Sequence, residues 1–269
     1  MKKILVLGAS GFIGKTICEE LSPDNEVYGT YCNNKVKPEG TMVVKLDMSN
    51  DDQILNILET VEPDVVISSI RGDFTYQMEM HRYLAKYLKA HGSRLFYLST
   101  ANVYDALTNK SHGESDAVKS VSDYGKFKIK CEDMLKEAMG PLVTILRLPM
   151  VFGKESKRIN DIKEGLKHGG PLVAYRDFYL SIHSDTLLAK QIAYLIDINA
   201  EGTIHLGSHD VIGYEEAMGL LKKQLGHENI KLQYERIQDQ PYYLALKTEK
   251  NLLPIDLIYS AEQVIDTIS

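Results

Sequence analysis

KKILVLGASGFIGKTICEEL, from Lys2 to Leu21, has the order strand, tight glycine turn, helix. A short apolar run leads into three glycines with the spacing G-x-x-G-x-x-G: Gly8, Gly11 and Gly14. Apolar residues then recur at helical spacing. Glycine lets a backbone approach a ligand with no Cβ in the way, and the following helix directs free N–H groups and its positive dipole end into the turn. A pyrophosphate group fits such a turn.

Three glycines at this spacing are weak evidence by themselves. They become informative here because they follow a predicted strand and precede a predicted helix. We expect the turn and the first helical residues to bind a dinucleotide cofactor: Gly8, Ser10, Gly11, Phe12, Ile13 and Gly14. Gly14 would also let the helix pack close to the strand. A plain strand–turn–helix without a ligand is the alternative.

The length and composition of the chain exclude several classes of protein. The 269 residues suffice for one sizeable core or a core with a lobe. The net charge of −6 argues against nucleic acid or an anionic membrane as partner. The chain shows no signal-peptide pattern and no apolar run of membrane-spanning length, so we expect a cytoplasmic protein. Three scattered cysteines read as reduced thiols, and the histidines lack metal-ligand spacing, so we expect no catalytic metal.

Strands and helices alternate along the first half of the chain. We expect further strands at Glu26–Tyr31, Met42–Leu46, Asp64–Ile70, Arg94–Ser99 and Val143–Arg147. Helices are expected at Asp52–Val61 and Phe74–His91, the second ending at Gly92. This alternation predicts an α/β fold with a Rossmann-type doubly wound parallel sheet, whose binding crevice lies at the C-terminal ends of the strands.

The loop after Glu26–Tyr31 bears on the choice of cofactor. In a dinucleotide fold an acidic residue here grips the ribose 2′-hydroxyl and favours NAD. This loop instead offers Asn33 and Lys35, with Lys37 beyond. These residues favour the 2′-phosphate of NADP, while NAD stays possible. The alternative is that the lysines belong to a solvated loop.

Tyr124 and Lys128 form the predicted catalytic pair. The pattern Y-x-x-x-K occurs three times: Tyr31/Lys35, Tyr124/Lys128 and Tyr243/Lys247. Only the second occurrence begins a predicted helix downstream of a strand that ends in Ser-Thr. The two residues lie four apart, on one face of the predicted helix. The lysine ammonium group can therefore lower the tyrosine pKa from ~10 by up to roughly 3 units, toward the range of acid–base catalysis. An ordinary exposed helix pair is the alternative.

Four motifs carry a resemblance to a known family: GASGFIG, LSTANVYD at Leu98–Asp105, the Tyr124–Lys128 pair, and ILRLPMVFG at Ile145–Gly153. Over its first ~150 residues the chain resembles the extended short-chain dehydrogenases/reductases of the NAD-dependent epimerase/dehydratase superfamily. Within them it is most similar to the dTDP-4-dehydrorhamnose reductase subfamily. The resemblance implies that Thr100 hydrogen-bonds the reacting oxygen, that Tyr124 donates a proton, and that Lys128 holds the cofactor ribose. Ser99 is the alternative candidate for the hydrogen bond to the reacting oxygen.

The resemblance also assigns further cofactor contacts. Asp47 and Met48 match an acid and an apolar residue that contact the adenine. The chain has Ser68-Ser69-Ile70 where relatives have Asn-Ala-Ala near the nicotinamide ribose, which is a departure from the family pattern. Leu148 stands where the family's backbone contacts the carboxamide.

Several polar and charged residues are candidates for substrate contacts. The candidates are Arg71, Asn102, Arg158, Arg176 and Tyr179. Guanidinium groups fork onto phosphate oxygens, although arginines more often form surface salt bridges. Ala101 replaces an acid that many of these reductases carry, so the substrate contact could differ.

We expect an NAD(P)-binding Rossmann domain over 1–153 and a small interleaved substrate-binding lobe over 154–269, with segments near 183–207 returning to the first domain. Its elements would include a helix at Ile159–His168, ended by Gly169, and an extended segment at Phe178–Ser184.

The resemblance implies an NAD(P)H-dependent reductase of a carbonyl, the 4-keto group of a nucleotide sugar, and a homodimer as a family expectation. One alternative is a nucleotide-sugar epimerase or dehydratase with tightly bound NAD. The other is a non-catalytic NADP-binding regulatory subunit.

Overall fold

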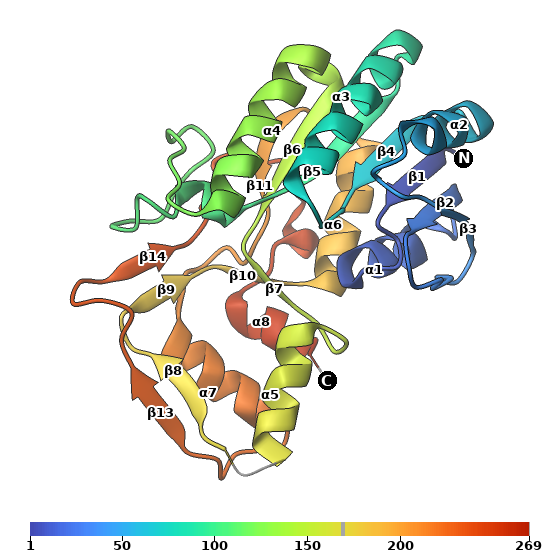
Figure 1. The fold of residues 1–269 in the computed structure, drawn as a ribbon. Helices are drawn as coiled ribbons and strands as arrows, with labels where there is room; N and C mark the ends of the chain where they lie inside the picture. The colour runs from blue at the N-terminus through green and yellow to red at the C-terminus, as the bar shows by residue number, and fades with distance from the viewer. Residues whose placement is uncertain (168–169, 269) are drawn as a thin grey trace. The chain divides into compact units, whose positions relative to one another are not determined.

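The computed structural model describes residues 1–167 and 170–268. Its main sheet has seven strands in the order β11-β6-β5-β4-β1-β2-β3 (Figure 1). Their bounds are β1 Lys3–Leu7, β2 Glu26–Tyr31, β3 Thr41–Lys45, β4 Val65–Ser68, β5 Arg94–Thr100, β6 Val143–Leu148 and β11 Gly202–His205. β1 pairs in parallel with β2 on one side and β4 on the other, so the strand order reverses there. The predicted doubly wound fold is confirmed.

Helices cover both faces of this sheet. They are α1 Phe12–Leu21, α2 Asp51–Val61, α3 Phe74–His91, α4 Asp123–Met139 and α6 Asp185–Asp197. Figure 1 shows α3 beside α4 on one face, with α1 and α6 on the other. Asp73 caps α3 by accepting the Thr75 and Tyr76 N–H groups, and Gly92 ends it with a left-handed φ of 70°. The predicted glycine stop is therefore confirmed.

Contacts divide the chain into two compact units. The first comprises Met1–Ser99, Lys126–Leu146 and Ala189–Ile204; the second comprises Thr100–Gly125, Arg147–Leu188 and His205–Ser269. The division at residue 153 expected from the sequence stays a prediction.

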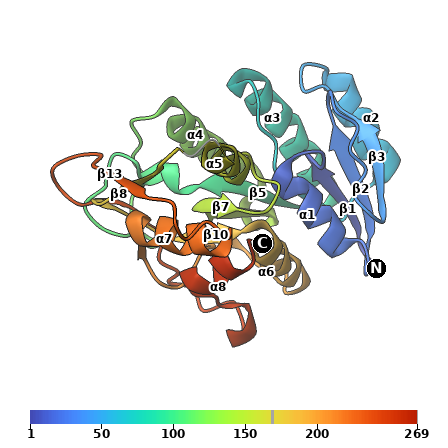
Figure 2. The ribbon, with the colours of Figure 1, turned by 90° about the horizontal axis from the view of Figure 1, so that it is seen from below.

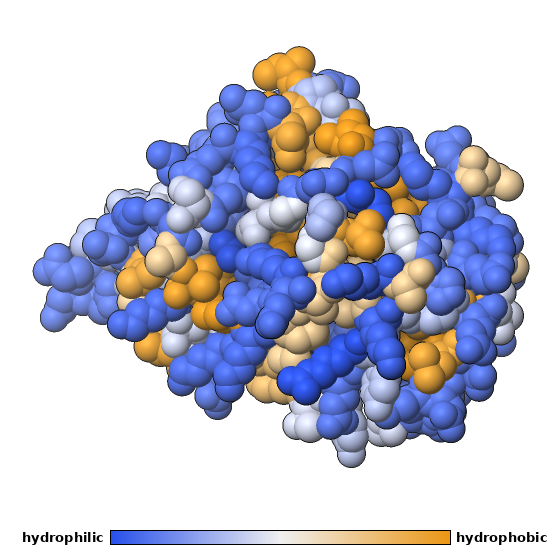
Figure 3. All heavy atoms as spheres, turned by 90° about the horizontal axis from the view of Figure 1, so that it is seen from above, coloured by the Kyte–Doolittle hydropathy of each residue, from blue (hydrophilic) through white to orange (hydrophobic). Residues whose placement is uncertain are grey.

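The first unit has an apolar core around β1. β1 is buried from Ile4 to Leu7 at 0% exposure, as a central parallel strand covered on both faces requires. Leu5 and Leu7 of β1 form one apolar cluster with side chains of α3 and α4, which include Leu84, Leu88 and Leu135. Each such side chain contributes about 1.5–3 kcal/mol through burial. α3 also exposes Phe74, Tyr76 and Tyr83. The face of the molecule in Figure 3 has hydrophobic groups scattered among hydrophilic ones.

The second unit contains short strands in three small sheets: β10-β7, β12-β9-β14 and β13-β8. In Figure 2, β13 lies beside β8 and β10 beside β7. The strands are β7 Met150–Phe152, β8 Leu172–Tyr175, β9 Phe178–Leu180, β10 Ile182–Ser184, β12 Ile212–Gly213, β13 Leu232–Glu235 and β14 Tyr242–Leu244. The helical elements are η1 Ala101–Tyr104, α5 Lys157–Lys167, α7 Tyr214–Gln224, η3 Ile255–Leu257 and α8 Ala261–Asp266, while η2 Gly140–Leu142 belongs to the first unit.

The expected helix at Ile159–His168 corresponds to α5; its expected end at His168 and the stop at Gly169 lie outside the described residues. The segment expected at Phe178–Ser184 is two strands separated at Ser181. The Ser181 hydroxyl accepts the Leu246 N–H at 3.0 Å. Among residues 1–167 and 170–268, no helix combines the length and apolar character needed to cross a membrane.

Candidate functional site

The glycine turn after β1 is held tightly. Gly8 has a φ of 88°, a conformation that favours glycine, and its N–H donates to Thr30 Oγ1 at 2.9 Å. A Cβ added to Gly14 would lie 2.2 Å from the Gly8 carbonyl oxygen and 2.8 Å from Ser69 Oγ. α1 therefore packs directly on the turn, and only glycine fits at residue 14.

The start of α1 faces this turn. Gly11 is its N-cap residue, with extended backbone and no side-chain cap, and the first turn holds no acidic residue. The first N–H groups of a helix have no partner within it, so such an end favours an anion. Gly11 is exposed, and Ser10, Phe12 and Ile13 are half-exposed. The predicted cofactor residues of the turn thus lie together, and all of them except the buried Gly14 are at least partly exposed.

The end of β4 braces the turn from the other side. Ser69 donates its N–H and its hydroxyl to the Leu7 carbonyl, at 3.0 and 2.8 Å. Ser68 Oγ lies 2.8 Å from His81 Nε2, and His81 Nδ1 lies 2.6 Å from the Gln77 carbonyl. A carbonyl only accepts, so Nδ1 carries the proton and Nε2 accepts from Ser68.

This Ser68–His81 pair is buried, with Ser68 at 2% and His81 at 0% exposure. Burial lowers the pKa of His81 to about 4, so its imidazole is neutral at neutral pH. The Ser68 hydroxyl therefore points into the first unit toward α3. Ile70, the last residue of this segment, packs against the core.

The predicted adenosine-side residues follow neighbouring strands. β2 and β3 pair in parallel, so the loops after them emerge at one sheet edge. Asn33 and Lys35 are exposed after β2, and Asp47 is exposed after β3. Hydrogen bonds from the Ser49 hydroxyl and N–H hold the pKa of Asp47 below its ordinary value. Met48 packs against the core.

Lys128 is held at the end of β5. Its Nζ donates to the Leu98 carbonyl at 2.8 Å, and the side chain is 4% exposed. Burial lowers its pKa to about 8, so the ammonium form predominates at neutral pH. Tyr124 lies four residues earlier in α4, one turn away and half-buried.

The two candidate hydroxyls after β5 have different partners. Ser99 donates to Glu132 Oε1 at 2.5 Å, deep in the first unit, where Glu132 is 1% exposed. Thr100 caps η1 instead: its Oγ1 accepts the Asn102 N–H at 3.2 Å and donates to Asn102 Oδ1 at 3.0 Å. Ser99 is thus occupied by a buried carboxylate, and Thr100 and Asn102 are brought together.

The substrate candidates of the second unit have separate neighbours. Arg158 donates to the Tyr214 hydroxyl at 3.4 Å. The Arg176 guanidinium stacks over Tyr234 at 4.0 Å and lies 3.6 Å from Glu215. Tyr179 stacks on Tyr243 with ring centroids 4.9 Å apart.

Two predicted residues remain, Arg71 and Leu148. Arg71 is exposed after β4 in the first unit. Leu148 is buried at the end of β6, so only its backbone is suited to hold a ligand.

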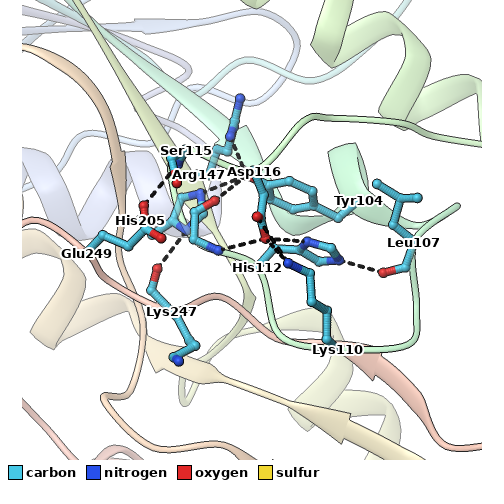
Figure 4. Close-up of polar contacts among 11 residues, drawn as sticks. Tyr104, Leu107, Lys110, His112, Ser115, Asp116, Arg147, His205, Lys247 and Glu249 are labelled. Carbon is cyan, nitrogen blue, oxygen red and sulfur yellow. Dashed lines mark hydrogen bonds and ion pairs between the residues drawn. The ribbon is translucent and has the colours of Figure 1, made fainter.

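A buried polar cluster in the second unit was not predicted from the sequence (Figure 4). Arg147 donates to the Tyr104 hydroxyl at 2.5 Å, and that oxygen lies 3.2 Å from His205 Nε2. His112 stacks on the Tyr104 ring and contacts Asp116 Oδ2 at 2.9 Å. These residues come from segments that are far apart in the sequence, so no pattern within one segment predicts the cluster.

A pocket of about 490 Å³ shares Asp116 with this cluster; it is lined by Lys110, Ser111, Gly113, Asp116, Lys247, Thr248 and Glu249. Two of its charged side chains have acceptor or ion-pair contacts here: Asp116 lies 3.0 Å from the Lys110 ammonium group, and Glu249 accepts the Ser115 N–H at 3.1 Å. Within the described part of the chain, no group of three His, Cys, Asp or Glu residues is arranged to hold a metal ion.

Sequence comparison finds one matching family model, the RmlD substrate binding domain, over residues 1–233. A dTDP-4-dehydrorhamnose reductase of Aggregatibacter actinomycetemcomitans is 26% identical over 166 residues, 57% of this chain and 53% of that protein. The methionine adenosyltransferase 2 subunit beta of Pongo abelii is 28% identical over 167 residues, 58% of this chain and 49% of that protein. The chain spans about half the length of these curated relatives.

Solved structures share the fold across the whole chain. The dTDP-4-dehydrorhamnose reductase of Yersinia enterocolitica superposes with a TM-score of 0.82 at 20% identity, covering 100% of both chains. The dTDP-glucose 4,6-dehydratase of Bacillus anthracis, in complex with NAD, gives 0.84 at 15% identity, covering 99% and 95%. Enzymes of different activities thus have this architecture.

Proposed function

The chain belongs to the RmlD substrate-binding-domain family and has the extended short-chain dehydrogenase/reductase fold, and from this membership we propose that it is an NAD(P)H-dependent reductase of a carbonyl. The substrate class we propose is a nucleotide sugar with a 4-keto group. One observation carries the proposal: Lys128 is buried as an ammonium group one helical turn from Tyr124. An exposed helix pair, the alternative to catalysis, would not hold its lysine in this way.

The glycine turn fits a dinucleotide. Gly14 has no room for a Cβ, and the uncapped start of α1 faces the turn, as pyrophosphate binding needs. Asn33 and Lys35 would hold a 2′-phosphate, so we propose NADP as the preferred cofactor and NAD as the second. Among solved relatives, a Bacillus anthracis reductase is in complex with NADP and the Bordetella bronchiseptica enzyme WbmH with NAD+. The cofactor would supply the hydride.

Three side chains would do the remaining chemistry. Tyr124 would donate its phenolic proton to the carbonyl oxygen as negative charge develops there. Lys128 would stabilise the phenolate left behind and hold the ribose. Thr100 would hydrogen-bond the same carbonyl oxygen in place of the neighbouring Asn102 amide, because Ser99 donates to the buried carboxylate of Glu132.

A regulatory subunit is the second candidate. The chain is 28% identical to a methionine adenosyltransferase beta subunit and 26% identical to the reductase, over stretches of similar length. Ser68–Ile70 and Ala101 also depart from the reductase pattern. Loss of a reductase activity on mutation of Tyr124 would exclude this candidate. A regulatory subunit would bind the cofactor and would not need the Tyr124 hydroxyl.

The deciding experiment follows NADPH oxidation over a panel of nucleotide-linked 4-keto sugars, with NADH in parallel. Tyr124→Phe is the test variant, and Tyr83→Phe, on the exposed face of α3, is the matched control. We expect turnover by the wild type and the control, and its loss in Tyr124→Phe. Full activity in Tyr124→Phe would contradict the mechanism. NAD that copurifies with the protein would favour an epimerase or dehydratase.

A further inference from the structure

Asp105 joins two ends of the loop that separates Thr100 from Tyr124. It follows η1, and its Oδ1 accepts the Val121 N–H at 2.6 Å. Its Oδ2 accepts a hydrogen bond from the hydroxyl of Ser122, two residues before Tyr124. The start of this loop is thereby fastened to its end.

Ser122 passes this contact on to α4. Its oxygen accepts the Gly125 N–H at 3.1 Å, in the manner of a helix N-cap. Because the hydroxyl proton is given to Asp105, the lone pairs of Ser122 are left to face the helix. Tyr124 lies within the turn that this bond closes.

The same turn is pressed against η1. A Cβ on Gly125 would lie 2.1 Å from Ser120 Oγ and 2.3 Å from the Asn102 carbonyl oxygen. Asn102 in turn exchanges two hydrogen bonds with Thr100. A continuous set of contacts therefore runs from Thr100 to the first turn of α4.

Asp105 is a charged member of this set. Burial raises its pKa, but hydrogen bonds from Ser122, Ser120 and Val121 outweigh burial, so the pKa lies below its ordinary value. The carboxylate is thus ionised at neutral pH, and hydrogen bonds to an ionised acceptor are stronger than neutral ones.

We propose that Asp105 is a positioning residue for Tyr124: through Ser122 it fixes the first turn of α4, and so the placement of the Tyr124 hydroxyl relative to Thr100. The inference rests on the proposed reductase function, in which both hydroxyls meet one carbonyl oxygen. Asp105 need not touch substrate or cofactor. Its effect reaches the reaction through the helix.

The first test is kinetic. Asp105→Asn keeps the size of the side chain but turns one acceptor into a donor, and Ser122→Ala removes the intermediate hydroxyl. We expect kcat to fall by about 10²-fold in each, since a small displacement of a reacting group has that effect, with the KM and the NADPH Kd within about twofold. Ser122→Thr, which keeps the hydroxyl, should recover activity to within about threefold.

A double-mutant cycle separates positioning from general weakening. If Asp105 acts through Ser122, the kcat of the double variant should be at most about threefold below the lower of the two single-variant kcat values. Asp116→Asn is the control, because Asp116 lies in the same loop but contacts Lys110 and His112. Its kcat should stay within about twofold of the wild type. Full activity in Asp105→Asn, or additive losses in the double variant, would overturn the proposal.

Amide hydrogen exchange gives a readout that does not depend on the activity. We expect peptides covering residues 123–127 to exchange about tenfold faster in Asp105→Asn and Ser122→Ala, and at the wild-type rate in Asp116→Asn and Ser122→Thr. Unchanged exchange in the first two variants overturns the positioning role. A wild type that reduces no substrate but shows this exchange pattern would count against the reductase function alone.

Discussion

The ammonium group of Lys128 lies over the face of the Tyr97 ring, 4.4 Å from its centroid. Tyr97 is 0% exposed, and the edge-on ring of His81 lies 5.1 Å from it. A ring face attracts a cation, and in a desolvated place the interaction is worth about 2 kcal/mol. Tyr97 therefore favours the charged form of Lys128 against the burial that lowers its pKa.

Removing this ring face should move the pH dependence of the reaction. In Tyr97→Leu we expect the pKa of Lys128 to fall further below about 8, so the alkaline loss of kcat/KM should shift to lower pH by about one unit. Tyr97→Phe keeps the face and should retain the wild-type profile. The measurement is kcat/KM against pH for all three proteins. Identical profiles in Tyr97→Leu and Tyr97→Phe would show that the ring does not tune Lys128.

We expect the Ser99 hydroxyl to have a structural role and the Thr100 hydroxyl to have a catalytic role. Thr100→Ala should lower kcat by about 10²-fold through loss of a donor to the carbonyl oxygen, with little effect on unfolding. Ser99→Ala should keep most of kcat but lower the free energy of unfolding by about 1–3 kcal/mol, because it strips a partner from buried Glu132. Steady-state kinetics and denaturant unfolding measure both. The reverse pattern would make Ser99 the catalytic hydroxyl.

The sheet, its helices and the glycine turn were predictable because their signals are local. Apolar runs, helical periodicity and glycine spacing lie within single segments of the chain. The confirmed turn at Gly8–Gly14 and the confirmed stop of α3 at Gly92 depend on backbone conformations that glycine supplies.

The partners of the candidate residues were not predictable in the same way. Ser68 meets His81 across a strand and a helix, and Lys128 meets Tyr97 from 31 positions away. Such pairs depend on how elements pack, which no spacing in the sequence encodes. The strands of the second unit, some only two to four residues long, carry too few residues for a periodic signal.

Gly14→Ala should damage both the fold and the cofactor site. The added Cβ would lie 2.2 Å from the Gly8 carbonyl oxygen, so α1 must shift away from the turn. We expect a loss of about 1–3 kcal/mol in the free energy of unfolding and an NADPH affinity weakened by about tenfold or more. Gly219→Ala in α7, where nothing lies within 4 Å of the added Cβ, is the matched control. It should stabilise the protein by about 0.5–1 kcal/mol and leave NADPH binding unchanged.

His81 should make the stability of the protein fall in mild acid. Its pKa is about 4 in the folded protein against an ordinary value of 6.5, because burial disfavours the imidazolium. Between these values the unfolded chain binds more protons than the folded one, so stability falls as the pH drops from about 6.5 toward 4. The full loss amounts to about 3 kcal/mol.

The variant His81→Gln isolates this contribution, because its amide oxygen can still accept the Ser68 hydroxyl but cannot titrate. His91→Gln, on the exposed end of α3, is the control and should keep the wild-type pH dependence. Free energies of unfolding from urea titrations at several pH values between 4 and 7 give the comparison. A wild-type slope that persists in His81→Gln would place the acid sensitivity elsewhere. If the slope flattens in that variant alone, the neutral imidazole behind Ser68 is the group that acid destabilises.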